Sequence, residues 1–358
     1  MDQNNTLPMT AGNAYNENCH QQTLIMEGSL PLFDDINLGS NLTIVDYGCS
    51  QGRNSIAMMQ RVLNRMAPSS TASLVFEDLP SNEFASLIRL LPELSASNPT
   101  LKIYPSLIPR SFYEPVIAPA TVDIGFTSST IHWLKRMPLL KPPTETVSEY
   151  YAKRTCRNAP EAEENFREFL TLRGQEIKSG GYFIIACFGS FTEEEITRYK
   201  DALILRHRIL FQAAEKLANE GKLPLKAMEK INVPIYDRSE EEFRSGIEEL
   251  KDTWVMEEYY RKMIPHPAYD KYLKACELED ADENSKTEAA KAYAGALIDW
   301  LVAVMGDMIK NWWRESGVED DKVDEIYQEL LVVAKDLLWK EGPGGAEIPL
   351  MYTRLRRA

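Results

Sequence analysis

The segment 43–55 holds the residues whose chemistry is most informative. An apolar strand pattern runs into Asp46, a loop follows with a glycine at each end (Gly48 and Gly52), and a helical pattern begins directly afterwards. Glycine has no Cβ, so the backbone can turn sharply there and approach a ligand closely. An acid at the carboxyl end of a strand faces the crevice in which open α/β sheets bind ligands. The same loop, Gly-Cys-Ser-Gln-Gly, also matches the Gly-x-Ser-x-Gly elbow of hydrolases, in which Ser50 would be the nucleophile.

A ligand cradle and a nucleophile are therefore the main interpretations of this loop. A nucleophile elbow follows a central strand and needs an acid and a histidine downstream. Here the loop follows the first predicted strand, and the four histidines leave a triad open (His20, His132, His207 and His266). The dinucleotide fingerprint Gly-x-Gly-x-x-Gly is absent from the loop. A tight turn without any ligand is the structural alternative.

The second predicted strand favours a nucleoside ligand without a pyrophosphate. It ends in Glu77-Asp78-Leu79, so a carboxylate stands where ribose hydroxyls would lie, and Leu79 can pack on a purine. Asp46 and Asp78 at successive strand ends suit a ligand that is cationic and carries a ribose. S-adenosylmethionine has both properties, since its ammonium and sulfonium groups are positive.

Composition excludes several other classes. The net charge of −14 argues against a broad basic surface for nucleic acid or for an anionic membrane. The five cysteines are odd in number and form no C-x-x-C pair, which favours reduced thiols in a cytoplasmic protein. The first residues lack the basic and apolar regions of a signal peptide. No apolar run approaches the length of a membrane span, so none is expected.

Strand and helix patterns alternate over the first half of the chain. Strands are predicted at 42–46, 74–77, 101–104, 122–126 and 182–187, with helices at 15–33, 53–66, 83–94 and 161–178, the last stopped by Gly180-Gly181. This order predicts an α/β fold with a doubly wound, mostly parallel sheet. Helices follow at 193–222, 240–262, 286–314 and 321–340, and a closing strand begins at 348. We expect a cofactor-binding core of residues 1–190, completed by 345–358, and a mainly helical cap of 191–344 lining the substrate pocket.

Seven segments, in chain order, resemble the SABATH methyltransferases of plants, which methylate small carboxylic acids or, in some members, purine nitrogens. The carboxyl-terminal third resembles them only loosely. The segments are Tyr15-Asn-Glu-Asn-Cys-His-Gln-Gln22, Asp46-Tyr-Gly-Cys-Ser-Gln-Gly-Arg-Asn54, Glu77-Asp-Leu-Pro-Ser-Asn-Glu-Phe84, Pro109-Arg-Ser-Phe-Tyr113, Ser128-Ser-Thr-Ile-His-Trp-Leu134, 166–181 and Asn232-Val-Pro-Ile-Tyr236.

The resemblance implies a Rossmann-like methyltransferase fold, S-adenosylmethionine as the methyl donor, and a homodimer. It also implies roles for individual residues. Gln22 and Trp133 would bind the substrate carboxylate, with Ser129 and His132 beside it, and Gln22, Trp133 and His132 would be the catalytic residues. The cofactor would be held by Tyr15, Cys19, Asp46, Gly48, Cys49, Ser50, Asn54, Asp78, Leu79, Ser111 and Phe112.

The sequence departs from the family pattern at several positions. Thr10 stands where the family commonly has lysine, and Cys19 replaces a serine. Ser129 replaces a tyrosine, which removes an aromatic wall and leaves room for a bulkier or more polar substrate. A metal site described for some members would fall near Tyr150, Glu229 and Asn232. Because tyrosine is a poor ligand at the first position, we predict no metal.

The chemistry of methyl ester formation agrees with these residues. A carboxylate is ionised near pH 7 and needs no general base. The site must supply alignment, worth up to roughly 7–11 kcal/mol in well-oriented systems, and neutral donors such as the Gln22 amide do not resist the loss of negative charge. The sequence therefore predicts an enzyme that forms methyl esters of small carboxylic acids. The alternatives are N- or phenol O-methylation with His132 as base, an esterase using Ser50, and a non-catalytic cofactor-binding protein.

Overall fold

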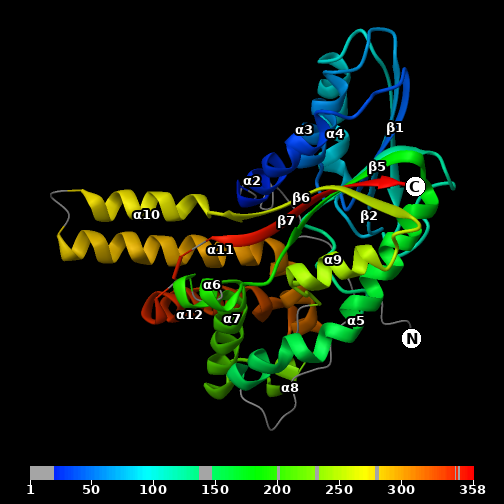
Figure 1. Ribbon diagram of the computed structural model, residues 1–358. Helices are drawn as coiled ribbons and strands as arrows, with labels where there is room; N and C mark the ends of the chain where they lie inside the picture. The colour runs from blue at the N-terminus through cyan, green and yellow to red at the C-terminus, as the bar shows by residue number, and fades with distance from the viewer. Residues whose placement is uncertain are drawn as a thin grey trace.

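A seven-stranded sheet forms the centre of the protein (Figure 1). The computed structural model describes residues 20–136, 147–199, 202–229, 234–278, 282–342, 344–345 and 347–358. The strands are β1 (Asn41–Tyr47), β2 (Thr71–Asp78), β3 (Lys102–Pro109), β4 (Val122–Ser128), β5 (Ile177–Phe188), β6 (Trp254–Ile264) and β7 (Ile348–Arg357), and they lie in the order β3-β2-β1-β4-β5-β7-β6.

The sheet is mostly parallel, as the sequence predicted. β1 pairs in parallel with β2 on one side and with β4 on the other, and β3 and β5 extend the parallel part outward. β7 enters antiparallel between β5 and β6. The chain order reverses at the β1–β4 pair, and in such sheets the crevice beyond the carboxyl ends of these strands binds ligands.

Helices cover both faces of the sheet because successive strand residues point to opposite faces. Along β1, Ile44 packs in one hydrophobic cluster and Val45 in the other. The first cluster includes side chains of α2 (His20–Ser29), the short η1 (Leu30–Phe33), α3 (Arg53–Leu63) and α4 (Phe84–Ala96). The second includes those of α5 (Val147–Glu176) and α9 (Glu240–Glu248). The doubly wound arrangement is therefore confirmed.

A second group of helices extends the first cluster away from the sheet. It consists of α6 (Glu193–Tyr199), α7 (Ala202–Asn219), α8 (Leu225–Glu229), α10 (Pro267–Glu277), α11 (Glu283–Glu315) and α12 (Asp320–Glu341). α10 and α11 run side by side, and α11 also packs on α7 and α12 (Figure 1). Among the described residues α11 is long and apolar enough to cross a membrane, but 72% of its most apolar window is buried inside the protein. It has the burial of a core helix.

Two of the predicted elements are wrong in type or extent. The helix expected over 240–262 ends at Glu248, and the rest becomes β6, whose charged and aromatic residues fit an edge strand. Gly180 and Gly181 do not stop α5, which ends at Glu176; they lie inside β5. Most of the helix expected over 193–222 is described as α6 and α7, and residues 200 and 201 between them lie outside the described residues.

The stretch 191–344, which was expected to be a mainly helical cap, also contributes a strand to the sheet. β6 lies within it and pairs with β7 along ten residues of register. The side-chain amide nitrogen of Gln21 donates to the carbonyl of Ile264 at 3.3 Å, and the Tyr260 hydroxyl donates to the carbonyl of Gly28 at 2.6 Å. These bonds attach α2 to the end and the middle of β6. The division into core and cap stays a prediction.

Candidate active site

The glycine loop after β1 is held by the end of β2. The amides of Gly48 and Cys49 donate to the carbonyl of Glu77, at 3.0 and 2.8 Å, and the Gly48 amide also lies 3.1 Å from a Glu77 carboxylate oxygen. The Ser50 amide donates to the Asp78 carboxylate at 2.6 Å. The two acids therefore fix the backbone of the loop.

Both glycines of the loop are required by its conformation. Gly48 and Gly52 have φ angles of +93° and +85°, which side chains other than glycine rarely adopt. A Cβ at Gly48 would lie 2.4 Å from Thr130, and one at Gly52 would lie 2.3 Å from Leu87. The loop can pass so close to its neighbours only because these positions have no side chain.

A small cavity lies where the sheet topology predicts a site, beyond the carboxyl ends of β1 and β4. Its volume is about 30 Å³, well below the several hundred Å³ of typical small-molecule sites. The lining residues are Gln22, Met26, Asp46, Gly48, Cys49, Ser50, Gly52, Arg53, Asn54, Ser55, Met58, Phe126, Ser128 and Ser129.

Two serines of this cavity combine backbone strain with an unpaired hydroxyl. Ser50 and Ser129 have φ angles of +48° and +56°, and neither Oγ has a hydrogen-bond partner within the described part of the chain. Left-handed non-glycine residues cost on the order of 1–3 kcal/mol and cluster at functional sites. Buried hydroxyls without a partner are rare in folded proteins. Both features indicate a place where a ligand completes the structure.

The absence of a partner at Ser50 also bears on the esterase alternative. A serine nucleophile needs a base within hydrogen-bond reach of its Oγ. No histidine side chain that the structure describes bonds to this atom. The described geometry therefore gives the hydrolase interpretation no support.

Gln22 projects from α2 into the cavity with its amide oriented by a residue far along the chain. The indole nitrogen of Trp300, on α11, donates to the amide oxygen of Gln22 at 3.1 Å. The amide nitrogen of Gln22 makes no hydrogen bond to any residue within the described ranges. The sequence placed Trp300 only within the helix predicted over 286–314, so it gave no signal for this contact.

The segment 131–134 is fixed from three sides by its backbone. The Tyr113 hydroxyl donates to the carbonyl of Trp133 at 2.7 Å. The amide of Tyr236 donates to the carbonyl of His132 at 2.8 Å, and the Arg238 guanidinium donates to the carbonyl of Ile131 at 2.7 Å. His132 packs edge-on against Phe188. His132 and Trp133 follow Ser129 in the chain but do not line the cavity, so the predicted carboxylate site is only partly assembled here.

Burial raises the pKa values of three acids around the loop. It raises the pKa of Asp46 to about 7, although a hydrogen bond from Ser55 opposes the shift. Burial also raises the pKa of Asp78 to about 6, against the bonds from the Ser50 and Leu79 amides, and raises that of Glu77 well above its usual range. A positive ligand next to these groups would favour their ionised forms.

The pKa of His132 is shifted in the opposite direction, downward. Burial lowers its pKa to about 3, and the charges of Arg238 and His207 lower it further. The imidazole is therefore neutral at every pH near 7. Its Nδ1 has no hydrogen-bond partner within the described ranges.

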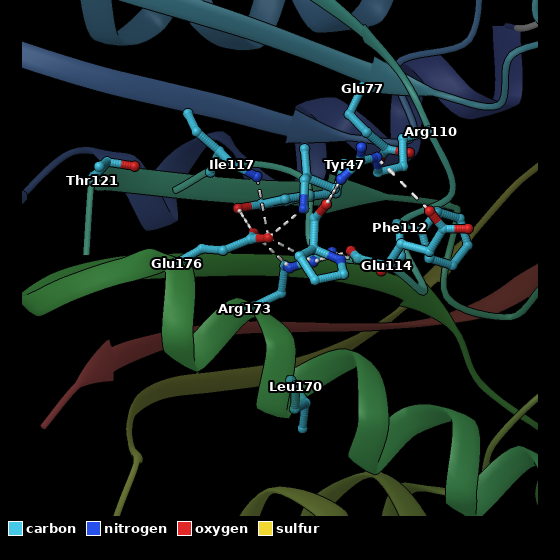
Figure 2. A network of polar contacts seen from close by, with 12 residues as sticks. Tyr47, Glu77, Arg110, Phe112, Glu114, Ile117, Thr121, Leu170, Arg173 and Glu176 are labelled. Carbon is cyan, nitrogen blue, oxygen red and sulfur yellow. Dashed lines mark hydrogen bonds and ion pairs between the residues drawn. The ribbon is translucent and has the colours of Figure 1, made fainter. Parts of the chain in front are cut away.

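A buried ion pair holds the loop after β3 (Figure 2). Arg173 and Glu176 of α5 are almost fully buried, with 3.0 Å between Nε and Oε2. Arg173 donates to the carbonyls of Phe112 and Glu114, at 2.8 and 3.0 Å, and its guanidinium carbon lies 4.3 Å from the centre of the Tyr47 ring. Glu176 accepts from the Tyr47 hydroxyl at 2.8 Å and from the backbone amide at position 116 at 2.6 Å.

The ion pair therefore ties the loop that carries Ser111 and Phe112 to the last residue of β1. The Phe112 ring packs edge-on against Phe169 of α5, at 5.6 Å between ring centres. Ser111 accepts a bond from the amide of Tyr113. Neither Ser111 nor Phe112 lines the cavity.

The predicted site residues thus fall into three groups. The structure brings together those around the cavity: Gln22, Asp46, Gly48, Cys49, Ser50, Asn54 and Ser129. A second set lies at the end of β2 and on adjoining loops and does not line the cavity: Asp78, Leu79, Ser111, Phe112, His132 and Trp133. Tyr15 and Cys19 lie outside the described residues. Within the described ranges no group of three potential metal ligands occurs.

The sequence model of S-adenosylmethionine-dependent carboxyl methyltransferases matches residues 5–331. The chain belongs to this family, the SABATH methyltransferases. The methyltransferase FUS9 of Gibberella fujikuroi is 29% identical over 310 residues, which are 84% of this chain and 82% of that protein. The indole-3-acetate O-methyltransferase 1 of Arabidopsis thaliana is 25% identical over 272 residues, 66% of this chain and 70% of that protein.

A solved structure shares the fold of this SABATH chain. A loganic acid methyltransferase with SAH superposes with a TM-score of 0.72 at 20% identity, covering 98% of both chains. The Rossmann-like methyltransferase fold predicted from the sequence is confirmed. S-adenosylmethionine is the methyl donor of the family, and the cradle of this chain fits it, because a positive ligand beside the loop would favour the ionised forms of the buried acids Asp46 and Asp78.

The buried ion pair of this SABATH chain gives a testable prediction. Replacing Glu176 by Gln leaves the Arg173 guanidinium buried without its charged partner, which typically costs about 3–5 kcal/mol. We expect a loss of this size in the free energy of unfolding, measured by urea titration. The matched control is Lys178→Gln, which breaks the half-exposed Lys178–Asp123 pair and should cost less than about 1 kcal/mol. Equal losses in the two variants would show that the buried pair has no special role.

Proposed function

We propose that this chain methylates a small carboxylic acid whose carboxylate is bound by Gln22 and Trp133. The observation that carries the proposal is the amide nitrogen of Gln22, a neutral donor with no partner within the described ranges, in the same cavity as the loop from Asp46 to Asn54. The unpaired Ser129 hydroxyl in that cavity supplies a third polar group.

Neutral donors suit the reaction better than a cation. S-adenosylmethionine, when bound, supplies a methyl group whose bond to the positive sulfur breaks as a bond to the substrate oxygen forms. The carboxylate loses its negative charge during this transfer. An arginine would stabilise the charged reactant and resist its loss, whereas an amide or indole N–H orients the oxygen with a bond worth about 1.5–3 kcal/mol. The task of Gln22 and Trp133 is alignment.

The neutral state of His132 favours an acid over a phenol or amine as substrate. With a pKa lowered to about 3, the imidazole is a very weak base near pH 7. A carboxylate is already ionised and needs no base. We assign His132 a place beside the substrate as an uncharged polar group.

We assign the remaining predicted residues to the cofactor. Asp46 would balance its positive charge, Asp78 would accept from ribose hydroxyls, and Leu79 and Phe112 would lie beside adenine. The other contacts would come from Tyr15, Cys19, Gly48, Cys49, Ser50, Asn54 and Ser111. The strained loop and the raised pKa values of the two acids support this assignment.

The name of one relative supports the substrate class. The Arabidopsis thaliana protein is named for indole-3-acetate, a small carboxylic acid. Ser129 stands where the family has a tyrosine, so we propose an acid bulkier or more polar than those that an aromatic wall admits. We further propose a cytoplasmic homodimer, from the free cysteines and the family resemblance. The net charge of −14 supports a small-molecule substrate rather than nucleic acid or a membrane as the partner.

The direct test is a panel of small carboxylic acids incubated with the chain and methyl-labelled S-adenosylmethionine. We expect label in a base-labile product, as a methyl ester gives, with at least one acid. Base-stable label from amines or phenols would identify the alternative reaction. Cofactor binding without turnover over the whole panel would leave the chain as a non-catalytic binding protein.

The proposed carboxylate site predicts a separation of two affinities. Gln22→Ala and Trp133→Phe each remove one donor, so kcat/KM for the acid should fall about 10- to 100-fold, while calorimetry should show S-adenosylmethionine binding near normal. The control Gln21→Ala removes the neighbouring buried amide, which bonds to Ile264, and should affect stability more than activity. If both donor variants lose cofactor binding instead, the assignment of these residues is wrong.

The raised pKa of Asp46 predicts pH-dependent cofactor binding. In the free protein this group is ionised above pH 7 and protonated below it, and a positive cofactor favours the ionised form. Between pH 8 and pH 6 the affinity for S-adenosylmethionine should therefore fall, by up to about tenfold per pH unit below 7. Titration calorimetry of the wild type and of Asp46→Asn tests this. The variant should bind more weakly and lose the part of the pH dependence centred near pH 7, while Asp78 still contributes near pH 6. A flat wild-type profile would contradict the role of Asp46.

A further inference from the structure

We propose that Trp300 is a positioning residue that turns the amide nitrogen of Gln22 toward the substrate carboxylate. The inference rests on the proposed function of Gln22. Trp300 lies on α11 and Gln22 on α2, 278 positions apart, and their contact is a single buried hydrogen bond of 3.1 Å. The two residues are 6% and 7% exposed.

The direction of this bond is fixed by chemistry. An indole nitrogen can only donate, and the amide of glutamine has one oxygen that accepts and one nitrogen that donates. The oxygen must therefore face Trp300, which leaves the nitrogen on the opposite side of the amide. With the amide turned over, its N–H groups would face the indole N–H, and its oxygen would face the substrate carboxylate. The amide would then repel both the indole N–H on one side and the substrate carboxylate on the other.

The backbone that carries Gln22 is itself held firmly. The hydroxyls of Tyr352 and Tyr260, on β7 and β6, donate to the carbonyls of Ile25 and Gly28 in α2, at 3.1 and 2.6 Å. The remaining freedom of Gln22 is the rotation of its side chain, and the bond to Trp300 restricts this rotation. On the other side, the Trp300 ring packs edge-on against His266, whose Nδ1 accepts from the first turn of α10.

In this proposal α11 influences the methyl transfer through the single hydrogen bond from Trp300 to Gln22. A correctly turned amide offers two N–H groups to a substrate atom that only accepts, as both carboxylate oxygens do. Trp300 would therefore contribute to the selection of carboxylates as well as to the rate. Its loss should affect the handling of the acid and leave the affinity for the cofactor unchanged.

The test is Trp300→Phe, which keeps an aromatic ring and removes the N–H group. We expect kcat/KM for the acid to fall about tenfold, with the affinity for S-adenosylmethionine unchanged. The matched control is Trp313→Phe on the same helix. Trp313 is fully buried, and its indole nitrogen has no hydrogen-bond partner within the described ranges. The control loses a similar volume without losing a bond, so it should retain activity within about twofold.

A double-mutant cycle separates action through Gln22 from a general effect of packing. In the Gln22→Ala background, Trp300→Phe should lower activity less than twofold further. Independent, multiplying losses in the double variant, or a loss of cofactor affinity in Trp300→Phe, would overturn the inference. Failure of the wild type to form any base-labile ester would instead overturn the proposed function, so the two failures are distinguishable.

Gln22→Glu supplies a second test if Trp300→Phe does not fold. This change keeps the shape of the side chain and an acceptor for Trp300, but it places an oxygen where the amide nitrogen faces the substrate. We expect folding by circular dichroism to be retained and methylation to fall more than 100-fold. Activity close to that of the wild type would show that the orientation of the amide is wrong.

Discussion

The site depends on the hydrogen bonds between the end of β2 and the glycine loop after β1. Glu77 and Asp78 hold three successive backbone amides, those of Gly48, Cys49 and Ser50, so they fix the loop in a strained conformation. The carboxylates that do this are buried, which raises their pKa values. Burial thus favours the uncharged forms of these two acids, and a positive ligand beside them would favour the ionised forms.

Separate parts of the molecule meet around this loop. α2 supplies Gln22 and the residue after β4 is Ser129, and both line the same cavity as the loop. The Arg173–Glu176 pair fixes the loop after β3 next to them. Each part is positioned by bonds to backbone atoms rather than by its own local sequence. α11 contacts one of these parts, since the indole nitrogen of Trp300 donates to the amide oxygen of Gln22.

Much of the parallel sheet was predictable because its strands are short apolar runs bounded by loops, which is the pattern of strands buried on both faces. β6 was not, because an edge strand with one exposed side carries charged and aromatic residues at a spacing that also fits a helix. Gly180 and Gly181 were taken as a helix stop, yet they lie within β5. Glycine is unfavourable inside both helices and strands, so a glycine pair does not show by itself which kind of element contains it.

The sequence by itself predicted the family and its cofactor, since the motif Asp46–Asn54 and the acid at Asp78 are local patterns that fit a positively charged nucleoside. It also predicted Gln22, Ser129, His132 and Trp133 as substrate residues, through the family resemblance. The tertiary structure alone decided which way the Gln22 amide faces and what charge the buried groups carry. Hydrogen-bond direction and desolvation depend on neighbours such as Trp300 and Arg238 that are distant in the chain, and no local pattern encodes those neighbours.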